Sequence, residues 1–377
     1  MGVIEIMTKT TTPTNINEIQ NIKTSGIAIN QIFSDHWETY FKKHRAKLRD
    51  VEIREVWKMP HCQDPSNGYL TFECPNCGET KTIHFNCNSR ICTHCGKIYN
   101  DKWASDLAGR LFDVPHRHVI MTMSHYLWPI FKNNWELLKV VMDSAIEAIA
   151  DAISKRAKRD LKPAFVVVLH TYGGDLKFNV HLHLLVAEGG FQGDKWVDVN
   201  VIPYTTLRHK WQEVLLTNLE KHLPDTEENR ELMRFFKEDF KKDFFVNAKR
   251  RITGGKKEIA RYIGRYIRHP AVANSRITNY DGKNVRFYYD KKDKDGKIIG
   301  RLYKTMEVEE FIEAIISHIP DNQFRTVRYY GAYWRIKKSK FKGIIDLETI
   351  YQKSLMDFIK ISNKWAQFAQ IVSAKWS

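Results

Sequence analysis

The feature that most constrains this chain is a cluster of cysteines, because all six lie between Cys62 and Cys95. In a chain of 377 residues such a cluster indicates metal ligands in a reducing compartment and not a disulfide framework. Cys74-Pro-Asn-Cys77-Gly and Cys92-Thr-His-Cys95-Gly have the spacing of two zinc knuckles, in which each thiolate pair binds one side of a tetrahedral ion. The spacing predicts that Cys74, Cys77, Cys92 and Cys95 hold one zinc ion.

Cys62 and Cys87 lie outside these two knuckles, and their role is open at this stage. They either pack as free thiols or combine with His61, His84 or His94 in a second zinc site. A closed site of four protein ligands stabilises a small domain and leaves no coordination position for a substrate. We therefore expect the zinc to be structural.

The charge balance indicates a polyanionic partner. Lys and Arg total 60 against 44 Asp and Glu, which gives a formal net charge of +16 and a pI near 9.4. Nucleic acid and anionic membrane are the two candidates. No apolar run approaches the roughly 20 residues that span a bilayer, and residues 1–23 lack the apolar core of a signal peptide. The sequence therefore predicts a cytoplasmic protein that binds nucleic acid and no membrane.

The order of patterns along the chain divides it into four parts. Residues 1–30 have little periodicity and are expected to form a flexible tail, and residues 31–110 a zinc-binding domain that recognises DNA. Residues 111–336 contain β-branched strands and amphipathic helices, and residues 337–377 a basic linker and a helix. The main expected elements are helices at 133–158, 206–223, 228–240 and 308–318, and strands at 118–123, 164–172, 180–187, 285–289 and 301–305.

A pair of histidines is the first candidate for catalysis. His181 and His183 stand two residues apart in Val180–Val186, an apolar strand, so both side chains emerge on one face and can bind one ion. The spacing alone is weak evidence, because the chain has 15 histidines and His116-Arg117-His118 is a second such pair. In a buried strand, however, two imidazoles without a ligand would be costly.

A pair of tyrosines is the second candidate. Tyr262 and Tyr266 lie one helical turn apart, and the sequence around them is rich in Lys and Arg. A phenol with a pKa of about 10 is a poor nucleophile at neutral pH, so nearby cations and a metal-polarised phosphate would assist it. The alternative is a helix that packs its tyrosines on a core. The basic residues expected to bind DNA are Arg250, Arg251, Lys256, Lys257, Arg261 and Arg265.

In this order, the motifs resemble the HUH endonucleases, and more closely the insertion sequence 91 family of rolling-circle transposases, which are bacterial relatives of Helitrons. The resemblance covers about residues 31–337 and includes all six cysteines. It runs through Leu169–Gly173, His181-Leu182-His183 and Tyr262–Tyr266, and continues into Met306–Phe311 and Arg325–Gly331.

The resemblance implies an α+β nuclease domain with a central antiparallel sheet flanked by helices, preceded by the small zinc-binding domain. It places His181 and His183 on a middle strand, as ligands of a catalytic Mg²⁺ or Mn²⁺, with the tyrosine helix beside the sheet. The family often has a histidine where this chain has Asn179 and a glutamine where it has Gly174. The third metal ligand is therefore open, with Asp175, His170 and His118 as candidates.

The expected function is that of a rolling-circle DNA transposase. One tyrosine attacks a phosphate of single-stranded DNA and forms a 5′-phosphotyrosine, which conserves the bond energy for rejoining without ATP. Tyr266 is slightly favoured as the first nucleophile. The expected partners are transposon ends, target DNA and a host helicase or replication machinery, at the bacterial nucleoid. Two alternatives are a plasmid or phage replication initiator, and a zinc-dependent DNA-binding regulator with an inactive nuclease centre.

Overall fold

The computed structural model describes residues 28–132, 134–199, 204–240, 242, 244–252, 254–264, 271–292 and 298–334. The expected tail (1–30, save for its last three residues) and the expected C-terminal helix within 337–377 lie outside this part of the chain, and so do Arg265 and Tyr266. The described residues form two compact units, each made of two segments. The cysteine unit contains residues 28–96 and 273–312, and the histidine unit contains 97–272 and 313–334, with the gaps given above.

The cysteine unit begins with two helices and a hairpin. The apolar residues Ile32, Phe33 and Trp37 of helix α1 are buried, as their helical spacing predicts. The hairpin strands pair antiparallel, with Tyr69 opposite His84 at one end and Glu73 opposite Thr80 at the turn. The elements are α1 (Ile29–His44), α2 (Asp50–Lys58), β1 (Tyr69–Glu73) and β2 (Thr80–His84).

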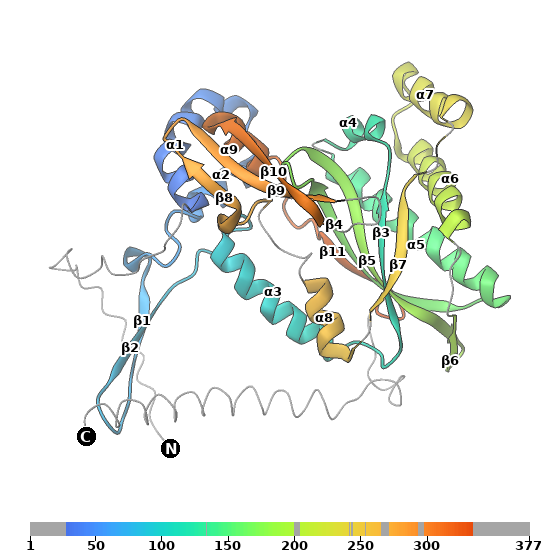
Figure 1. The fold of residues 1–377 in the computed structure, drawn as a ribbon, viewed down its shortest axis with the longest axis horizontal. Helices are drawn as coiled ribbons and strands as arrows, with labels where there is room; N and C mark the ends of the chain where they lie inside the picture. The colour runs from blue at the N-terminus through green and yellow to red at the C-terminus, as the bar shows by residue number, and fades with distance from the viewer. Residues whose placement is uncertain are drawn as a thin grey trace. The chain divides into compact units, whose positions relative to one another are not determined.

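The second segment of the cysteine unit forms a three-stranded antiparallel sheet in the order β10-β9-β8 (Figure 1). One face of this sheet buries Val285 and Phe287, and the ring of Phe287 lies 6.1 Å from that of Phe311 on the following helix. The elements are β8 (Ile277–Tyr280), β9 (Asn284–Lys292), β10 (Ile298–Glu307) and α9 (Val308–Ile316).

The histidine unit is built on a six-stranded antiparallel sheet. The strand order is β11-β4-β5-β3-β7, and β6 pairs with the end of β5. The prediction of an α+β fold with a central antiparallel sheet is confirmed, and β5 is the middle strand. The strands are β3 (His116–Thr122), β4 (Lys162–Tyr172), β5 (Phe178–Gln192), β6 (Lys195–Asp198), β7 (Val246–Ile252) and β11 (Val327–Gly331).

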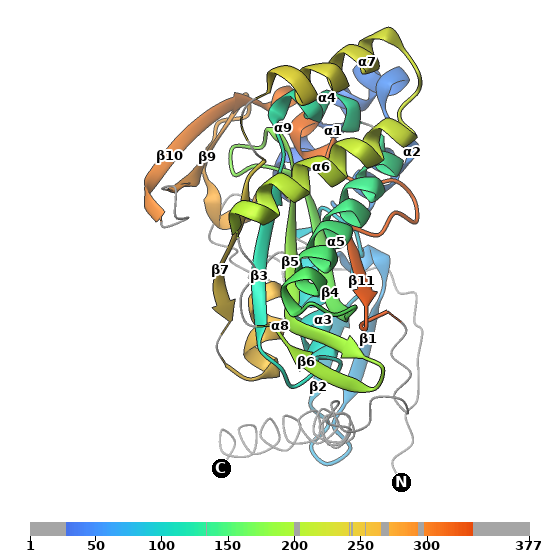
Figure 2. The same cartoon turned by 90° about the vertical axis from the view of Figure 1, so that its right-hand side faces the viewer.

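Helices cover one face of this sheet and form the main core with it (Figure 2). Alternate strand residues such as Val167, Leu182 and Leu184 point into this core and meet Trp211 from α6. Helix α5 begins where the Asn134 side chain accepts a hydrogen bond from the Leu137 amide, at 3.2 Å. The helices are α4 (Trp128–Phe131), α5 (Trp135–Ala157), α6 (Tyr204–His222) and α7 (Glu227–Arg234).

Two further helices belong to this unit, α3 (Thr93–Ala108), from Lys97 onward, and α8 (Lys256–Gly264). They pack closely, because a Cβ added at Gly264 would lie 3.2 Å from the Ala104 Cβ (Figure 1). A residue without a side chain thus allows α8, which contains Tyr262, to lie against α3.

Candidate active site and zinc centre

The sheet separates apolar and histidine side chains onto opposite faces. On β5, Val180, Leu182 and Leu184 join the core under the helices, so His181 and His183 stand on the other face. The neighbouring strands bring two more histidines to these. His170 on β4 lies directly opposite His181, and β3, which contains His118, pairs with β5 on its other side.

Three of these histidines form a group that could bind a metal ion. The ligand nitrogens of His170, His181 and His183 all lie within 4.8 Å of one another. His183 is buried, with 7% of its surface exposed, whereas His170 and His181 are half-buried. Three imidazoles with access on one side are a common donor set for a divalent transition metal. Of the three candidates for a third ligand, His170 therefore has the geometry to serve.

Asp175, the carboxylate candidate, is not part of this group. It lies in the turn between β4 and β5, where its Oδ1 accepts a hydrogen bond from the Lys177 amide at 3.3 Å. The Lys177 ammonium lies 3.8 Å from its Oδ2. These contacts help to close the turn. The expectation that it adds a ligand finds no support in this geometry.

A chain of hydrogen bonds joins the group to a tyrosine. His118 Nε2 lies 3.0 Å from His183 Nδ1, and His118 Nδ1 lies 2.9 Å from the hydroxyl of Tyr262. Both His118 and Tyr262 are buried, at 4% and 7% exposure. Helix α8 therefore presents the first tyrosine of the pair to the histidine face of the sheet.

The basic residues expected to bind DNA are only partly described. Lys257 and Arg261 are exposed on α8, and Lys256 is half-buried at its start. Arg251 is also exposed, but its Nε lies 2.7 Å from the buried carboxylate of Glu188, which Arg117 also contacts. Arg251 therefore has a structural ion pair in addition to any role in DNA binding. The side chain of Arg250 lies outside the described residues, as do all atoms of Arg265.

The cysteines form a site that differs from the expected one. Cys62, Cys87, Cys92 and Cys95 have their sulfurs within 4.8 Å of one another, and three of the distances are 3.5–3.6 Å. A zinc–sulfur distance of about 2.3 Å in a tetrahedron requires sulfur–sulfur separations of roughly 3.8 Å, so the four residues fit a zinc ion. Cys74 and Cys77 are not in this group, and the prediction that they share an ion with Cys92 and Cys95 is corrected.

The β1–β2 hairpin explains the correction. Cys62 and Cys87 flank the hairpin, and the Gln63 amide donates to the Phe85 carbonyl at 3.0 Å, so closing the hairpin brings these two cysteines together. Cys74 and Cys77 lie at the turn, about 16 Å away for a strand of five residues. The turn is a knuckle, in which the Gly78 amide donates to the Cys74 carbonyl at 2.9 Å with Gly78 at φ 67°.

The thiols of the four-cysteine site differ in pKa, and the hydrogen bond with Cys92 raises the pKa of Cys87. The hydrogen bond from Cys87 lowers the pKa of Cys92 to about 5, which favours a thiolate there. Burial raises the pKa of Cys62 to about 12, so without a cation this thiol stays protonated. The surrounding backbone is fixed from outside, because Ser89 Oγ donates to the Glu55 carbonyl at 2.7 Å and the Arg90 amide donates to the Glu55 carboxylate. Such outer contacts orient metal ligands.

Within the described residues, no helix is both long and apolar enough to cross a bilayer.

His116, on the same strand as His118, is not a ligand candidate, because its Nε2 contacts the buried Tyr333 hydroxyl at 2.6 Å. Burial lowers the pKa of His116 to about 4, so it stays neutral in the folded protein.

Comparisons with known proteins agree with this geometry. Residues 32–123 match the family model described as "Transposase zinc-binding domain", and residues 164–340 match the one described as "Putative transposase". The transposase for insertion sequence element IS801 of Pseudomonas savastanoi pv. phaseolicola is 28% identical over 300 residues, covering 75% of this chain and 70% of that protein. The transposase y4qJ of Sinorhizobium fredii is 24% identical over 325 residues, covering 81% and 80%.

Among solved structures, the chain is similar to the N-terminal origin-recognition/nickase domain of non-structural protein 1 from human bocavirus. The identity is 11%, with a TM-score of 0.24 over 34% of this chain and 61% of that one. The two family models together match the cysteine site and the histidine sheet, in the order that the motifs predict. The chain belongs to the insertion sequence 91 family of transposases.

Proposed function

We propose that this transposase cuts and rejoins single-stranded DNA by the rolling-circle route, with a tyrosine as nucleophile. The observation that carries the proposal is the chain of contacts from Tyr262 through His118 to His183, beside His170 and His181. On one face of a sheet lie a phenol, a histidine hydrogen-bonded to it and a group of histidines that could bind a metal ion. Such components can support the transfer of a phosphodiester to a tyrosine.

His170, His181 and His183 would hold a divalent cation, Mg²⁺ or Mn²⁺. When bound, the cation polarises a phosphoryl oxygen and stabilises the charge that develops on it. The three imidazoles are softer donors than Mg²⁺ prefers, so Mn²⁺ suits them better. Of the two cations that the resemblance implies, Mn²⁺ is therefore the one we propose.

The position of His118 lets it assist Tyr262 when Nδ1 carries its hydrogen. A histidine that binds a metal through one nitrogen usually donates the hydrogen of the other nitrogen to a neighbour. In that state, His183 donates from Nδ1 to Nε2 of His118, and His118 donates from Nδ1 to the oxygen of Tyr262. A donor at this position stabilises the phenolate, which is the nucleophilic form of the side chain.

In the transfer step, the phenol oxygen of a tyrosine forms a bond to phosphorus while the bond from phosphorus to the 3′ oxygen breaks. The tyrosine loses its proton and the released 3′-OH gains one, so the protein and the DNA balance without another reactant. The reverse step, from a second DNA end, reseals the strand. Tyr266 would hold one end while Tyr262 acts on another.

The zinc ion has a structural role in this proposal. Cys62, Cys87, Cys92 and Cys95 use all four positions of a tetrahedral ion, so the zinc would fold the cysteine unit and take no part in the reaction. We propose that residues 31–110, of which 31–96 belong to the cysteine unit, recognise the transposon end.

The test is a nicking assay on a labelled single-stranded oligonucleotide that carries the transposon end, with Mn²⁺ or Mg²⁺. The wild-type protein should form a covalent adduct that survives denaturation in detergent. Tyr262→Phe and Tyr266→Phe should each retain one cleavage, whereas the double variant should form no adduct. An adduct in the double variant would place the nucleophile elsewhere. If the wild-type protein binds the DNA but never cuts it, the chain acts as a DNA-binding regulator.

A further inference from the structure

The sheet of β8, β9 and β10 has one buried and one exposed face. Val285, Phe287 and Met306 alternate on the buried face, with exposures of 0%, 0% and 4%. Side chains on the opposite face belong to the residues between them, by the two-residue period of a strand. The cross-strand pairs on this second face are Arg286 with Thr305, Tyr288 with Tyr303, and Asp290 with Arg301.

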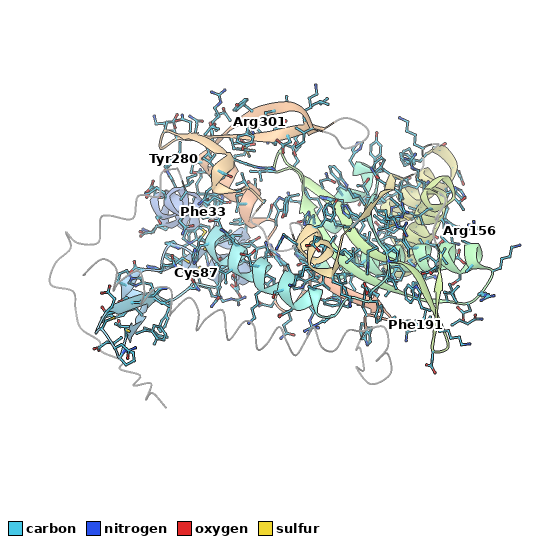
Figure 3. The ribbon with its side chains drawn as sticks, turned by 60° about the horizontal axis from the view of Figure 1, so that its bottom comes forward. Phe33, Cys87, Arg156, Phe191, Tyr280 and Arg301 are labelled. Carbon is cyan, nitrogen blue, oxygen red and sulfur yellow. The ribbon has the colours of Figure 1, made fainter. Side chains whose placement is uncertain are left out.

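Arginines and tyrosines alternate on the exposed face and stack on one another. The guanidinium of Arg301 lies 4.5 Å from the centre of the Tyr288 ring, and that of Arg286 lies 5.0 Å from the centre of the Tyr303 ring. The two rings are 6.3 Å apart. Tyr303 is 55% exposed, which is high for a residue in the middle of a paired strand. Figure 3 shows Arg301 on this ribbon.

The charge of this face is positive. Among the described residues, Arg276, Arg286 and Arg301 face two carboxylates on this side of the sheet. These are Asp290, which pairs with Arg276 at 3.5 Å, and the exposed Glu307, which lies opposite Asn284. Arg286 and Arg301 are both exposed, so each can still reach a phosphate while its plane stacks on a ring. The face therefore offers flat aromatic surface and two cations within one ribbon.

We propose that this face, defined by Arg286, Tyr288, Arg301 and Tyr303, binds single-stranded DNA. Unpaired bases expose their faces and stack on aromatic side chains, whereas a duplex keeps those faces covered. The arginines would contact the phosphates on either side of a base stacked on Tyr303. The inference rests on the proposed function, since that function supplies the single strand. It adds a binding surface in the cysteine unit, which contains none of the catalytic residues.

The test is fluorescence anisotropy with the full-length zinc protein and a labelled oligo-dT strand, without added Mg²⁺ or Mn²⁺. Stacking on an aromatic side chain contributes roughly 1–3 kcal/mol per base, so Tyr303→Ala should weaken binding about 5-fold to 150-fold. Tyr303→Phe keeps the ring and should bind within about twofold of the wild type. Removing both Arg286 and Arg301 should lower the slope of log affinity against log salt by about 1.4.

Matched controls separate stacking from loss of charge or fold. Arg230→Ala on α7 removes one exposed cation outside the face and should leave the affinity nearly unchanged. Zinc content and the unfolding temperature of Tyr303→Ala should equal those of the wild type. A double-stranded oligonucleotide should lose much less affinity than oligo-dT on the same substitution.

Three results would overturn the inference. They are unchanged binding of oligo-dT by Tyr303→Ala, an equal loss in Tyr303→Phe, and an equal loss on duplex DNA. The inference and the proposed function fail separately, because the binding assay needs no cleavage. If the protein never nicks DNA but needs Tyr303 to bind oligo-dT, only the proposed nuclease function is disproved. If the protein nicks DNA but binds oligo-dT equally well without Tyr303, only the proposed binding surface is disproved.

Discussion

His170 and His181 lie directly opposite each other on the neighbouring antiparallel strands β4 and β5, with ring centres 5.1 Å apart. This register makes His170 the neighbour of the histidine pair, although His170 lies eleven positions before His181 in the sequence. A shift of the strand pairing by one residue would turn the His170 side chain toward the core. The first prediction concerns the ligand that this pairing adds.

His170→Ala should abolish Mn²⁺-dependent nicking or shift it to a much higher metal concentration, because it removes one of the three proposed ligands. Asp175→Ala is the matched control and should keep the metal requirement of the wild type, since Asp175 is not part of the three-histidine group. A titration of nicking rate with Mn²⁺ measures both. The assignment of His170 fails if the Asp175 variant, and not the His170 variant, needs more metal.

His118→Ala should reduce the nicking rate by about 10–100-fold, the usual effect of losing a residue that orients a metal ligand. Binding of the oligonucleotide should change little, because His118 is buried at 4% exposure and contacts Tyr262 and His183. Single-turnover rates at saturating DNA separate the two effects. A loss of affinity with an unchanged rate would contradict this role.

Cys62→Ser or Cys87→Ser should release the zinc ion and unfold the cysteine unit. Cys74→Ser and Cys77→Ser should leave that ion in place, because their sulfurs are not part of the four-cysteine group. Zinc content measured by atomic spectrometry, with circular dichroism of each purified variant, distinguishes the two pairs. Zinc loss in the Cys74 and Cys77 variants alone would restore the pairing predicted from spacing.

Stability should fall in mild acid because of His116. Its folded pKa of about 4 lies below the ordinary histidine value of 6.5, so the unfolded chain takes up a proton first. The stability that neutral His116 contributes is complete above pH 6.5 and is lost as the pH falls toward 4. At pH 5 the loss from this residue is about 2 kcal/mol. Burial lowers the pKa of His318 to about 4 as well, so it adds to the pH response. Urea unfolding at pH 7 and pH 5 measures the difference, and His116→Asn should reduce it by about 2 kcal/mol. An equal pH response in that variant would contradict the assignment.

The sequence predicted the centre of the fold well and its edges less well. The alternation in Val180–Val186 is a strong signal, and both histidines lie on one face of β5 as expected. Strand β7 was missed, because its basic residues were interpreted only as a DNA-binding segment. Its alternation was present, since Val246 and Ala248 are buried in the core. Charge on an edge strand is common and does not exclude pairing.

The metal sites show what spacing can and cannot decide. Two cysteines three residues apart predict a knuckle, and the Cys74–Cys77 turn has that backbone. Spacing cannot tell which pairs meet, because that depends on how the chain between them folds. The hairpin of β1 and β2 decides it here. In the same way, sequence named His170 as one candidate among three, and only the strand register selects it.

The cysteine unit is made of residues 28–96 and 273–312, which has a consequence for how the protein is made. A ribosome synthesises the first segment early, but the strands β8, β9 and β10 follow only after most of the histidine unit. The unit cannot complete its fold on the nascent chain until residue 312 has left the ribosome. An expression fragment that ends at residue 110 would lack those strands and their contacts with α1, such as the hydrogen bond from the Tyr280 hydroxyl to Asp35 at 2.8 Å.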